Sequence, residues 1–293
     1  MVITNVIGGL GNQMFQYAAG RALSLERGVS LRLDVSRFAS YELHQGFELE
    51  RLFKCKAGIA NETDMRNIFG LQFSPIIRKI LSRPSLAIFR CKGFVIEPHY
   101  HYWKGVKDSP ADCYLAGYWQ SEKYFLEVDK QIRDDFSFKL PLDVENSEWA
   151  KKIGQTNSVS LNVRRGDYVG DSRNLKKYKL CSIDYYREAI RYIVERIENP
   201  HFFIFSDDMA WVKSNLKINF PYSYVDCNHG ENSANDMRLM SLCRHNIIAN
   251  SSFSWWGAWL NKNSEKIIIA PEHWFNNNFA MTKDLYPSGW VSL

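Results

Sequence analysis

The chain has 293 residues, of which 45% are hydrophobic and 24% charged. This is the composition of a globular protein with a sizeable buried core, in one large or two modest domains. The net charge of +5 is spread along the chain, whereas nucleic-acid-binding proteins concentrate positive charge on one surface. We therefore expect no nucleic-acid partner, and a mild positive surplus fits a small anionic substrate. The six cysteines show no CxxC pair and no zinc-ligand spacing, so we expect reduced thiols.

The sequence shows no targeting or membrane-spanning segment. No basic stretch followed by an apolar one occurs near Met1, and no apolar run is long enough to span a bilayer. We expect a cytoplasmic protein. Peripheral contact with a membrane stays open, although nothing in the sequence argues for it.

The first residues predict a β-α-β unit. Residues 2–7 form an apolar strand, residues 8–11 a glycine turn, and apolar side chains then recur at helical spacing from Asn12 until Gly28. Residues 31–34 alternate like a second strand. The middle of the chain is less regular, and there we expect helices at 62–68, 75–81 and 122–136 and short strands at 94–96 and 114–119.

From residue 158 onward, strands and helices alternate regularly. Strands are predicted at 159–163, 202–205, 222–226, 247–249 and 267–270, and helices at 185–198, 209–216, 235–243 and 253–260. This alternation predicts a parallel sheet covered by helices on both faces. We place a domain boundary in the polar stretch 145–157, which gives an N-terminal domain of residues 1–150 and a C-terminal domain of residues 151–293. The predicted fold class is α/β, with two Rossmann-like domains facing a central cleft.

Ligands of open α/β sheets bind beyond the carboxyl ends of the strands, so the residues after each strand are candidates for a site. The strand at 159–163 leads into Arg164, Arg165, Gly166 and Asp167. A guanidinium fits a phosphate because its planar fork donates two hydrogen bonds, although an arginine–aspartate ion pair explains the same residues. Because side chains alternate along a strand, we expect the two arginines to point opposite ways, one toward a ligand and the other toward a loop, for example through Asp167.

Acidic residues follow the next two strands. Asp207 and Asp208 are either N-caps of the next helix or a carboxylate pair for a metal, but no Asp-x-Asp pattern supports the metal. Asp236 begins a helix, where it is either a cap or an acceptor for N–H groups of a ligand.

Two serines follow a further strand and begin the last predicted helix. Ser251 and Ser252 offer hydroxyls and backbone N–H groups to a phosphate, with support from the helix dipole. Capping alone accounts for one serine and leaves the clustering of donors unexplained.

The N-terminal glycine loop partly resembles a dinucleotide-binding fingerprint. Gly9 and Gly11 stand in the pattern, and Asp34 ends the next strand where a ribose carboxylate would lie, but the third glycine is missing. An NAD- or NADP-dependent oxidoreductase that uses these residues is therefore one alternative. Asn12 and Gln13 place amides at the same loop, which suits recognition of hydroxyl groups.

Four segments in this order resemble the α-1,2-fucosyltransferase family (glycosyltransferase family 11): GGLGNQMFQYA from Gly8, NVRRGDY from Asn162, FSDD from Phe205 and NSSFSWWGAWL from Asn250. Together they extend over nearly the whole chain. The resemblance implies a GT-B fold, with the acceptor on the side of the N-terminal domain and GDP-fucose in the C-terminal domain. It also implies inverting transfer of fucose to O2 of a terminal galactose, with no cofactor and no metal.

The resemblance assigns roles by position. Arg164 matches the arginine that binds the donor β-phosphate, Asn12 lies in the loop that faces fucose and acceptor, and Asp236 lies where relatives bind guanine. Asp171 is our candidate base, although the family does not require a side-chain base. The full set of candidate donor-binding residues is Gly9, Gly11, Asn162, Arg164, Asp236, Ser251, Ser252 and Phe253.

One position departs from the family pattern. The arginine motif of the family usually begins with histidine, and this chain has Asn162 there. We expect the asparagine to act through its shape, its backbone or a hydrogen bond that an amide can replace. If the imidazole did acid–base work instead, the chain would be a non-catalytic protein that binds a sugar nucleotide, which is the second alternative.

Overall fold

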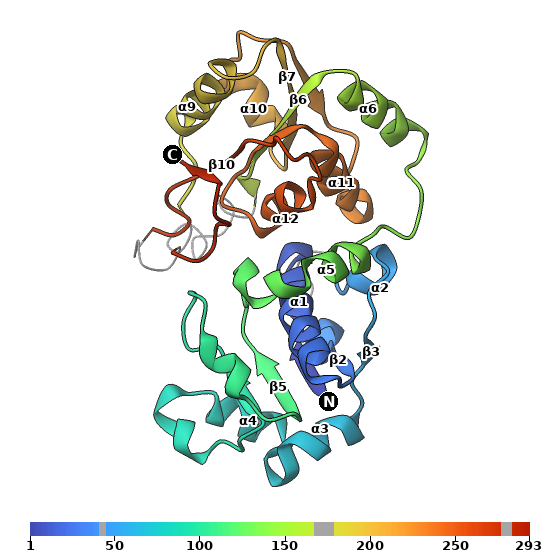
Figure 1. The fold of residues 1–293 in the computed structure, drawn as a ribbon, viewed down its shortest axis with the longest axis vertical. Helices are drawn as coiled ribbons and strands as arrows, with labels where there is room; N and C mark the ends of the chain where they lie inside the picture. The colour runs from blue at the N-terminus through green and yellow to red at the C-terminus, as the bar shows by residue number, and fades with distance from the viewer. Residues whose placement is uncertain (41–44, 167–178, 277–282) are drawn as a thin grey trace. The chain divides into compact units, whose positions relative to one another are not determined.

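The computed structural model describes residues 1–40, 45–166, 179–276 and 283–293. It divides into two compact units, Met1–Lys139 (unit 1) and Leu140–Leu293 (unit 2) (Figure 1). Each unit is built on one parallel sheet with helices packed on it, as the α/β prediction requires. The placement of two domains about a central cleft stays a prediction. No helix in the described part of the chain has the length and apolar composition that crossing a membrane requires.

Unit 1 has a five-stranded sheet in the order β3-β2-β1-β5-β4, and every neighbouring pair is parallel. Its strands are β1 (Val2–Asn5), β2 (Leu31–Asp34), β3 (Gly58–Ile59), β4 (Phe94–Ile96) and β5 (Cys113–Ala116). Its α-helices are α1 (Leu10–Arg27), α2 (Leu49–Leu52), α3 (Glu62–Phe69), α4 (Pro75–Leu81) and α5 (Asp129–Asp135). Its 3-10 helices are η1 (Ser36–Ser40), η2 (Gly70–Gln72), η3 (Pro84–Phe89), η4 (Lys104–Asp108), η5 (Glu122–Tyr124) and η6 (Leu126–Val128).

Helix α1 packs closely on the central strand of unit 1. The helix ends at Gly28, whose φ of 63° is the left-handed conformation that glycine adopts without penalty. Within the helix, Gly20 faces Thr4 of β1 so closely that a Cβ atom on Gly20 would lie 2.0 Å from the Thr4 hydroxyl oxygen. The missing side chain at Gly20 therefore sets the distance between helix and sheet.

This close approach gives a stability prediction. We expect Gly20→Ala to lower the free energy of unfolding by about 1–3 kcal/mol, because the added methyl group would overlap the fully buried Thr4 side chain. The matched control is Gly154→Ala, since a Cβ there would meet nothing within 4 Å, and alanine favours a helix over glycine. Chemical denaturation of both variants measures the difference, and equal stabilities would contradict the packing argument.

Unit 2 has a six-stranded parallel sheet in the order β11-β10-β9-β6-β7-β8. Its strands are β6 (Asn157–Val163), β7 (Pro200–Ser206), β8 (Tyr222–Val225), β9 (His245–Ile247), β10 (Ile268–Ala270) and β11 (Val291–Ser292). Its described helices are α6 (Val144–Gly154), α9 (Ile183–Val194), α10 (Met209–Asn215), η7 (Gly230–Asn232), α11 (Ala234–Leu242) and α12 (Ser252–Leu260).

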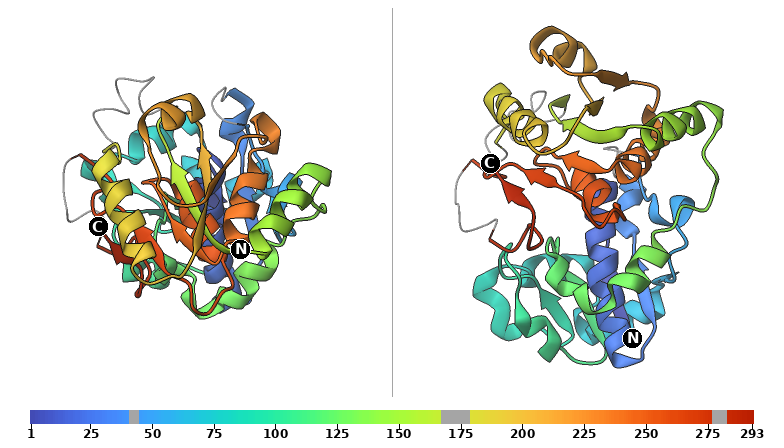
Figure 2. Two further views of the ribbon diagram at one scale, coloured as in Figure 1. Left: turned by 90° about the horizontal axis from the view of Figure 1, so that it is seen from above. Right: turned by 45° about the horizontal axis from the view of Figure 1, so that its top comes forward.

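The two faces of the unit 2 sheet bury alternate residues of β7. Phe202 and Ile204 pack with α9 and α10 on one face, and Phe203 and Phe205 pack with α6 and α11 on the other. Figure 2 shows the sheet between α9 (yellow) and α6 (green) in its left panel. The sheet is therefore covered on both sides, as the continuous apolar strands predict.

The expected domain boundary needs correction. Residues 145–157, which we read as a polar connection, are helix α6 and the start of β6, and the division between units falls at Lys139 and Leu140. Asp143 caps α6 by accepting a hydrogen bond from the Asn146 N–H at 2.8 Å, and Ile153 is fully buried. The polar residues mark the solvent face of an amphipathic helix.

Residues 122–136 also differ from expectation, because they form η5, η6 and α5 instead of one helix.

Candidate functional site

The order of the strands in unit 2 locates a crevice at its centre. From β6 the chain proceeds through β7 to β8 on one side, and then returns to β9 and β10 on the other side of β6. The direction of winding reverses between β6 and β9, and ligands of such sheets bind outside the carboxyl ends of the strands at this point. Arg164 follows β6, and Ser251 follows β9 at the start of α12.

Asp207 fixes the loop that carries Arg164. Its carboxylate lies 3.0 Å from the Arg164 guanidinium and also accepts the backbone N–H groups of Arg165 and Gly166, at 2.8 and 3.0 Å. A Cβ on Gly166 would lie 2.8 Å from this carboxylate, so glycine lets the loop approach Asp207 closely. The Arg164 side chain keeps 27% of its surface exposed. The ion pair therefore positions Arg164 and leaves part of it accessible.

Arg165 has different partners from Arg164. Its guanidinium lies 3.5 Å from Asp208 and stacks over the Trp211 ring at 3.8 Å. Asp208 is also the N-cap of α10, because it accepts the Trp211 N–H at 3.1 Å. Capping is thus confirmed for Asp208 and wrong for Asp207. Asp167, through which we expected a loop contact, lies outside the described residues.

No group of three or more His, Cys, Asp or Glu side chains in the described ranges is arranged to hold a metal ion. Asp207 and Asp208 instead each engage one arginine. The cations paired with these two carboxylates beside β6 are therefore Arg164 and Arg165.

Asn162, the residue that departs from the family motif, is buried on β6. Its amide N–H donates a long bond of 3.4 Å to the Phe205 carbonyl, and its side-chain oxygen has no hydrogen-bond partner among the described residues. A buried acceptor without a partner costs free energy in the unliganded protein. Asn162 therefore holds an unused acceptor two residues before Arg164.

Helix α12 begins without a side-chain cap. Ser251 has N-cap backbone geometry, with φ −135° and ψ 124°, but its hydroxyl makes no capping hydrogen bond. Capping by Ser251 is therefore wrong, and the first N–H groups of α12 have no side-chain partner in the part of the chain described. Ser252 is partly exposed at the first helical position, whereas the side chain of Phe253 packs on the α6–α11 core. Any contribution of Phe253 to a ligand would come from its backbone.

Asn250 anchors this helix start to neighbouring segments. It is fully buried, its amide donates to the carbonyls of Trp274 (3.1 Å) and Lys179, and its oxygen lies 3.6 Å from the Cys181 sulfur. The beginning of α12 is consequently held in place without using its own N–H groups.

Asp236 has an unusual environment at the start of α11. Its carboxylate accepts an N–H from Asn228 at 2.8 Å, and Asn228 exchanges hydrogen bonds with Asn146 of α6. Burial raises the pKa of Asp236 to about 7, with a smaller contribution from Asp226, while the bond from Asn228 acts in the opposite direction. The helix position N-terminal to α11 is occupied by Ser233, and Asp236 makes no capping bond in the described structure. The capping interpretation of Asp236 is therefore wrong.

The glycine loop of unit 1 lies at a second reversal of strand order, between β1 and β5. Gly9 is the N-cap of α1, and its carbonyl accepts the N–H groups of Asn12 and Gln13 at 2.9 and 3.1 Å. Gly11 is buried in the first turn of α1. The Asn12 oxygen accepts a hydrogen bond from Gln120, after β5, at 2.8 Å. Asn12 and Gln120 thus join the two loops at this edge.

Gln13 does not serve as the free amide that we expected. Its amide donates to the carbonyls of Gly8 and Gly46, at 2.9 and 2.8 Å, and its oxygen accepts the Glu48 N–H at 3.0 Å. The side chain is fully buried. Gln13 therefore holds loops together.

Asp34 is also engaged within unit 1. One carboxylate oxygen accepts the Tyr114 hydroxyl at 2.7 Å and the other accepts the Ser36 N–H at 3.1 Å. The side chain is buried. A ribose would have to displace these bonds, so the oxidoreductase alternative is not favoured.

Sequence reasoning missed Glu97, which follows β4. Its two carboxylate oxygens accept the N–H groups of Tyr118 and Trp119, at 2.7 and 3.0 Å. Burial raises the pKa of Glu97 to about 7, and these two bonds act in the opposite direction. Glu97 thereby fixes the loop after β5, in which Trp119 has a φ of 55°. The sequence offered one indication of its role: Glu97 directly follows the predicted strand 94–96, in the irregular middle of the chain.

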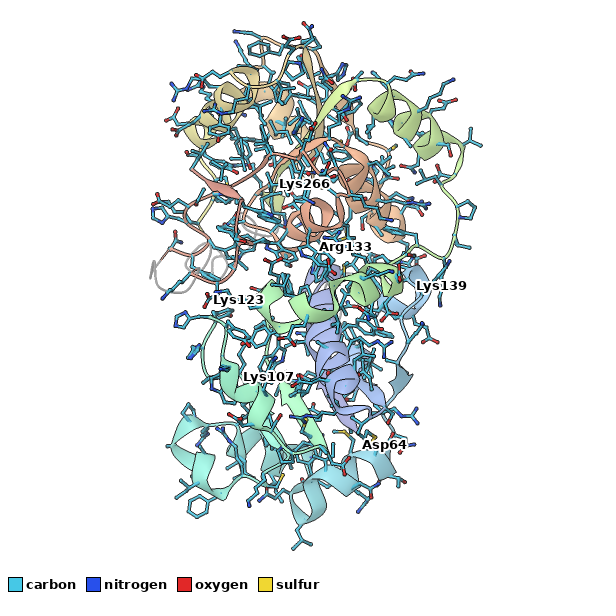
Figure 3. The ribbon with its side chains drawn as sticks, in the orientation of Figure 1. Asp64, Lys107, Lys123, Arg133, Lys139 and Lys266 are labelled. Atoms are coloured by element: carbon cyan, nitrogen blue, oxygen red, sulfur yellow. The ribbon has the colours of Figure 1, made fainter. Side chains whose placement is uncertain are left out.

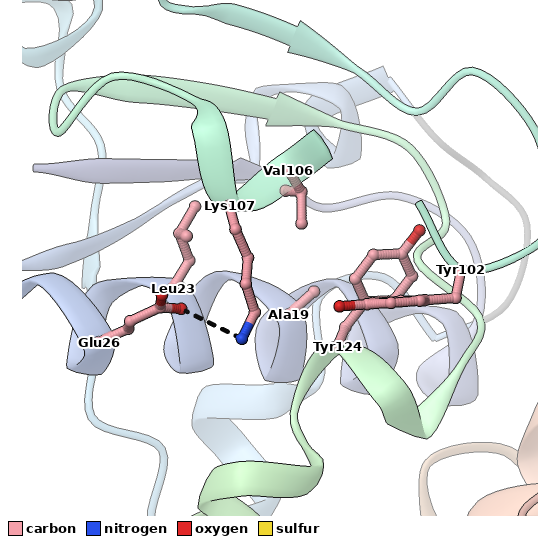
Figure 4. A pocket seen from close by; sticks show the side chains of 7 residues that line it. All are labelled: Ala19, Leu23, Glu26, Tyr102, Val106, Lys107 and Tyr124. Atoms are coloured by element: carbon pink, nitrogen blue, oxygen red, sulfur yellow. Dashed lines mark ion pairs between the residues drawn. The ribbon is translucent and has the colours of Figure 1, made fainter. Parts of the chain in front are cut away.

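Two cavities in unit 1 lie away from the glycine loop. The larger, of about 380 Å³, is lined by Ala22, Leu25 and Glu26 of α1 and by residues of η4 to α5. Figure 4 shows the smaller one beside it, where Lys107 lies 4.0 Å from Glu26, and Figure 3 marks Lys107 and Lys123 beside α1. These α1 residues belong to the C-terminal half of the helix, whereas the glycine loop lies at its N-terminus.

Comparison with known proteins identifies the family. The model of "Glycosyl transferase family 11" matches residues 74–293. The chain belongs to glycosyltransferase family 11. It is 40% identical to an Escherichia coli alpha-1,2-colitosyltransferase, covering 100% of this chain and 99% of that protein.

Other relatives are consistent with this assignment. The chain is 33% identical to the E. coli O-antigen biosynthesis glycosyltransferase WbnK, covering 98% of both chains. It is 24% identical to the Bos taurus galactoside alpha-(1,2)-fucosyltransferase 2, over 87% of this chain and 67% of that protein. A crystal structure of NodZ alpha-1,6-fucosyltransferase with GDP shares the fold, with a TM-score of 0.54 at 14% identity over 87% of this chain and 90% of that one.

The role of Glu97 can be tested by stability. Glu97→Gln keeps the size but replaces one acceptor oxygen with an N–H₂ group, which leaves a backbone N–H of Tyr118 or Trp119 unpaired. We expect a loss of about 1–3 kcal/mol in the free energy of unfolding. The control is Glu62→Gln, because Glu62 is exposed and pairs only with Arg66 one helical turn away. If thermal or urea unfolding ranked the two variants equally, Glu97 would not hold this loop.

Proposed function

We propose that this family 11 glycosyltransferase moves fucose from GDP-fucose to O2 of a terminal galactose, with inversion, forming an α-1,2 linkage. The observation that carries the proposal is the Arg164 guanidinium, fixed by Asp207 on one side of the β6–β9 crevice, with the uncapped N-terminus of α12 on the other. The first offers a cation and the second offers N–H donors. Both suit a diphosphate.

The reaction is favoured by hydrogen-bond donors and cations beside the diphosphate of the donor substrate. Glycosyl transfer passes through an oxocarbenium-like transition state, by analogy with glycoside hydrolysis. Negative charge then develops on the departing GDP, and preorganised donors stabilise that charge more than they stabilise the ground state. We propose that Arg164, Ser251, Ser252 and the backbone of Phe253 supply these donors without a metal, and that the Asn162 oxygen accepts a hydrogen bond from the donor substrate.

Unit 1 would bind the acceptor. We propose that Gly9 and Gly11 face the donor and that Asn12 faces both fucose and acceptor, because the amide pair Asn12–Gln120 lies at the β1–β5 crevice. An acceptor hydroxyl must lose its proton as it attacks the fucose. We propose Asp171 for that step because it follows the arginine motif closely in the sequence; it lies outside the described residues.

Colitose is a second candidate sugar, because the relative at 40% identity is named an alpha-1,2-colitosyltransferase. Colitose differs from fucose in lacking the hydroxyl at C3. GDP-fucose and GDP-colitose should therefore be compared with the same acceptor, lactose, and the ratio of their kcat/KM values measures the preference. We also propose that the enzyme works in the cytoplasm on a bacterial polysaccharide precursor, as the O-antigen relative suggests.

The central test is transfer by purified protein. We expect release of GDP and formation of a fucosylated trisaccharide from GDP-fucose and lactose, unaffected by EDTA.

Arg164→Ala should lower kcat/KM at least about a hundredfold with the fold intact, as loss of one preorganised donor does. Arg187→Ala is the control, because Arg187 is exposed and its partner among the described residues is Asp184, three positions away on α9. Normal turnover by Arg164→Ala would remove Arg164 from the mechanism, and NAD binding without GDP binding would overturn the proposal.

The pKa of Asp236 gives a pH prediction for nucleotide binding. We propose that its ionised carboxylate accepts N–H groups of guanine, so binding should favour loss of the proton. With a pKa of about 7, the Kd for GDP should fall about tenfold between pH 6 and pH 8. By the same linkage the unliganded protein should lose stability as the pH rises from about 4 to about 7, because Asp236 ionises less readily in the folded chain.

Asp236→Asn is the matched variant for this prediction. It should bind GDP more weakly at pH 8 and lose most of the pH dependence, while any contribution from the phosphate groups of GDP remains in both proteins. Inosine diphosphate, which lacks the amino group of guanine, should lose affinity for the wild type but little for the variant. Isothermal titration calorimetry measures the Kd for GDP of the wild type and the variant at pH 6 and pH 8. If the two proteins showed the same pH dependence, Asp236 would be excluded from base recognition.

A further inference from the structure

A surface segment of unit 1 combines exposed apolar side chains with positive charge. Residues 65–96 contain no aspartate or glutamate. The segment comprises the end of α3, then η2, α4 and η3, and ends with β4, an edge strand of the sheet. Figure 1 shows α4 and the turn that follows it (teal) at the margin of unit 1.

The inner side of this segment is firmly anchored. Leu81 is buried in the core cluster on α3, β4 and β5, and Phe73 and Leu86 pack against that cluster. Arg90 donates to the Leu81 carbonyl at 2.6 Å, which ties the end of η3 to the end of α4. Gln72 donates to the Phe89 carbonyl at 2.8 Å, which ties η2 to η3. The three short helices therefore form one connected surface.

The outer side of the segment is apolar. Its exposed large side chains are Leu71, Ile76, Ile77, Ile80, Ile88 and Phe89, which we call the apolar patch. Leu71 is 99% exposed, Ile88 85% and Ile76 71%. Ile76 and Ile80 lie one turn apart on the same face of α4. Large apolar side chains exposed on connected short helices indicate an interaction site.

The charges around the patch fall into two groups. Arg66, Arg78 and Arg90 are used within unit 1: Arg66 pairs with Glu62, Arg78 lies over the Phe69 ring, and Arg90 binds carbonyls. The side chains of Lys79, Arg83 and Lys92 are exposed, and within the described residues they make no hydrogen bond or ion pair. The patch is thus bordered by three cations that are available to a partner.

We propose that the apolar patch and these three cations dock unit 1 on a membrane surface that contains anionic phospholipid. Apolar side chains on short amphipathic helices insert at the boundary of headgroups and acyl chains, and lysine and arginine beside them attract anionic headgroups. The long stems of these cations let them reach the headgroups while the apolar side chains are immersed. A second copy of the chain fits less well, because a symmetric contact would bring like charges together with no acidic residue in the segment to balance them.

The experiment is co-sedimentation of the full chain with vesicles. One set contains phosphatidylcholine alone and the other 70% phosphatidylcholine with 30% phosphatidylglycerol. We expect binding to the anionic vesicles that weakens as salt is raised. Two variants, Ile76→Ser/Ile80→Ser/Ile88→Ser/Phe89→Ser and Lys79→Glu/Arg83→Glu/Lys92→Glu, should each lower the partition coefficient at least tenfold.

Matched controls alter similar residues in unit 2. Leu140→Ser/Val144→Ser removes exposed apolar side chains there, and Lys217→Glu/Lys262→Glu changes exposed charges. Both controls should bind vesicles like the wild type, and circular dichroism should show that all variants are folded. The proposal is overturned if the wild type ignores anionic vesicles, or if patch and control variants bind equally. It is also overturned if the patch variants abolish a dimer in analytical ultracentrifugation and leave vesicle binding unchanged.

Discussion

The ion pair between Asp207 and Arg164 is the contact on which the unit 2 site depends. One carboxylate accepts the guanidinium and two consecutive backbone N–H groups, so the direction of the chain after β6 and the position of the cation are set together. A guanidinium held before the ligand arrives loses little conformational freedom on binding. Asp207 also neutralises part of the guanidinium charge, and the N–H groups at the start of α12 offer further donors beside it. The Asn162 oxygen, which has no partner among the described residues, adds an acceptor. The crevice therefore works as a set of donors and acceptors whose geometry comes from β6, β7 and β9.

Much of the fold could be predicted from the sequence because its elements are amphipathic or uniformly apolar. Strand β2 and helix α4 have the predicted bounds, since turn residues flank short apolar runs on both sides. Helix α6 was missed because its exposed face supplies most of its residues, and its buried side rests on few apolar positions such as Ile153. The two-residue strands β3 and β11 carry no periodicity that could be read. Their formation depends on the neighbouring strand.

The candidate site was predicted in outline, but its local assignments were not. Adjacent residues of like chemistry were given one role and have two: Asn12 joins the crevice while Gln13 is internal, and Asp208 caps a helix while Asp207 holds the arginine loop. Successive side chains point in different directions, so which of two neighbours faces a site depends on the exact register of the backbone. The sequence alone does not fix this register. Glu97 was missed for a related reason, since its partners are backbone groups more than twenty positions away.

Asn228 has a consequence for how this part of the chain can vary. It donates to Asp236, and it both gives a hydrogen bond to Asn146 and receives one from it, while Asn146 also binds the cap residue Asp143. In such a chain of oriented amides, an exchange that removes or reverses a donor or an acceptor leaves the neighbouring member without a matching partner, whereas one that keeps the accepting oxygen does not. The start of α6 and the acidic position of α11 should therefore covary among homologues, and mutations that combine them should show strong epistasis.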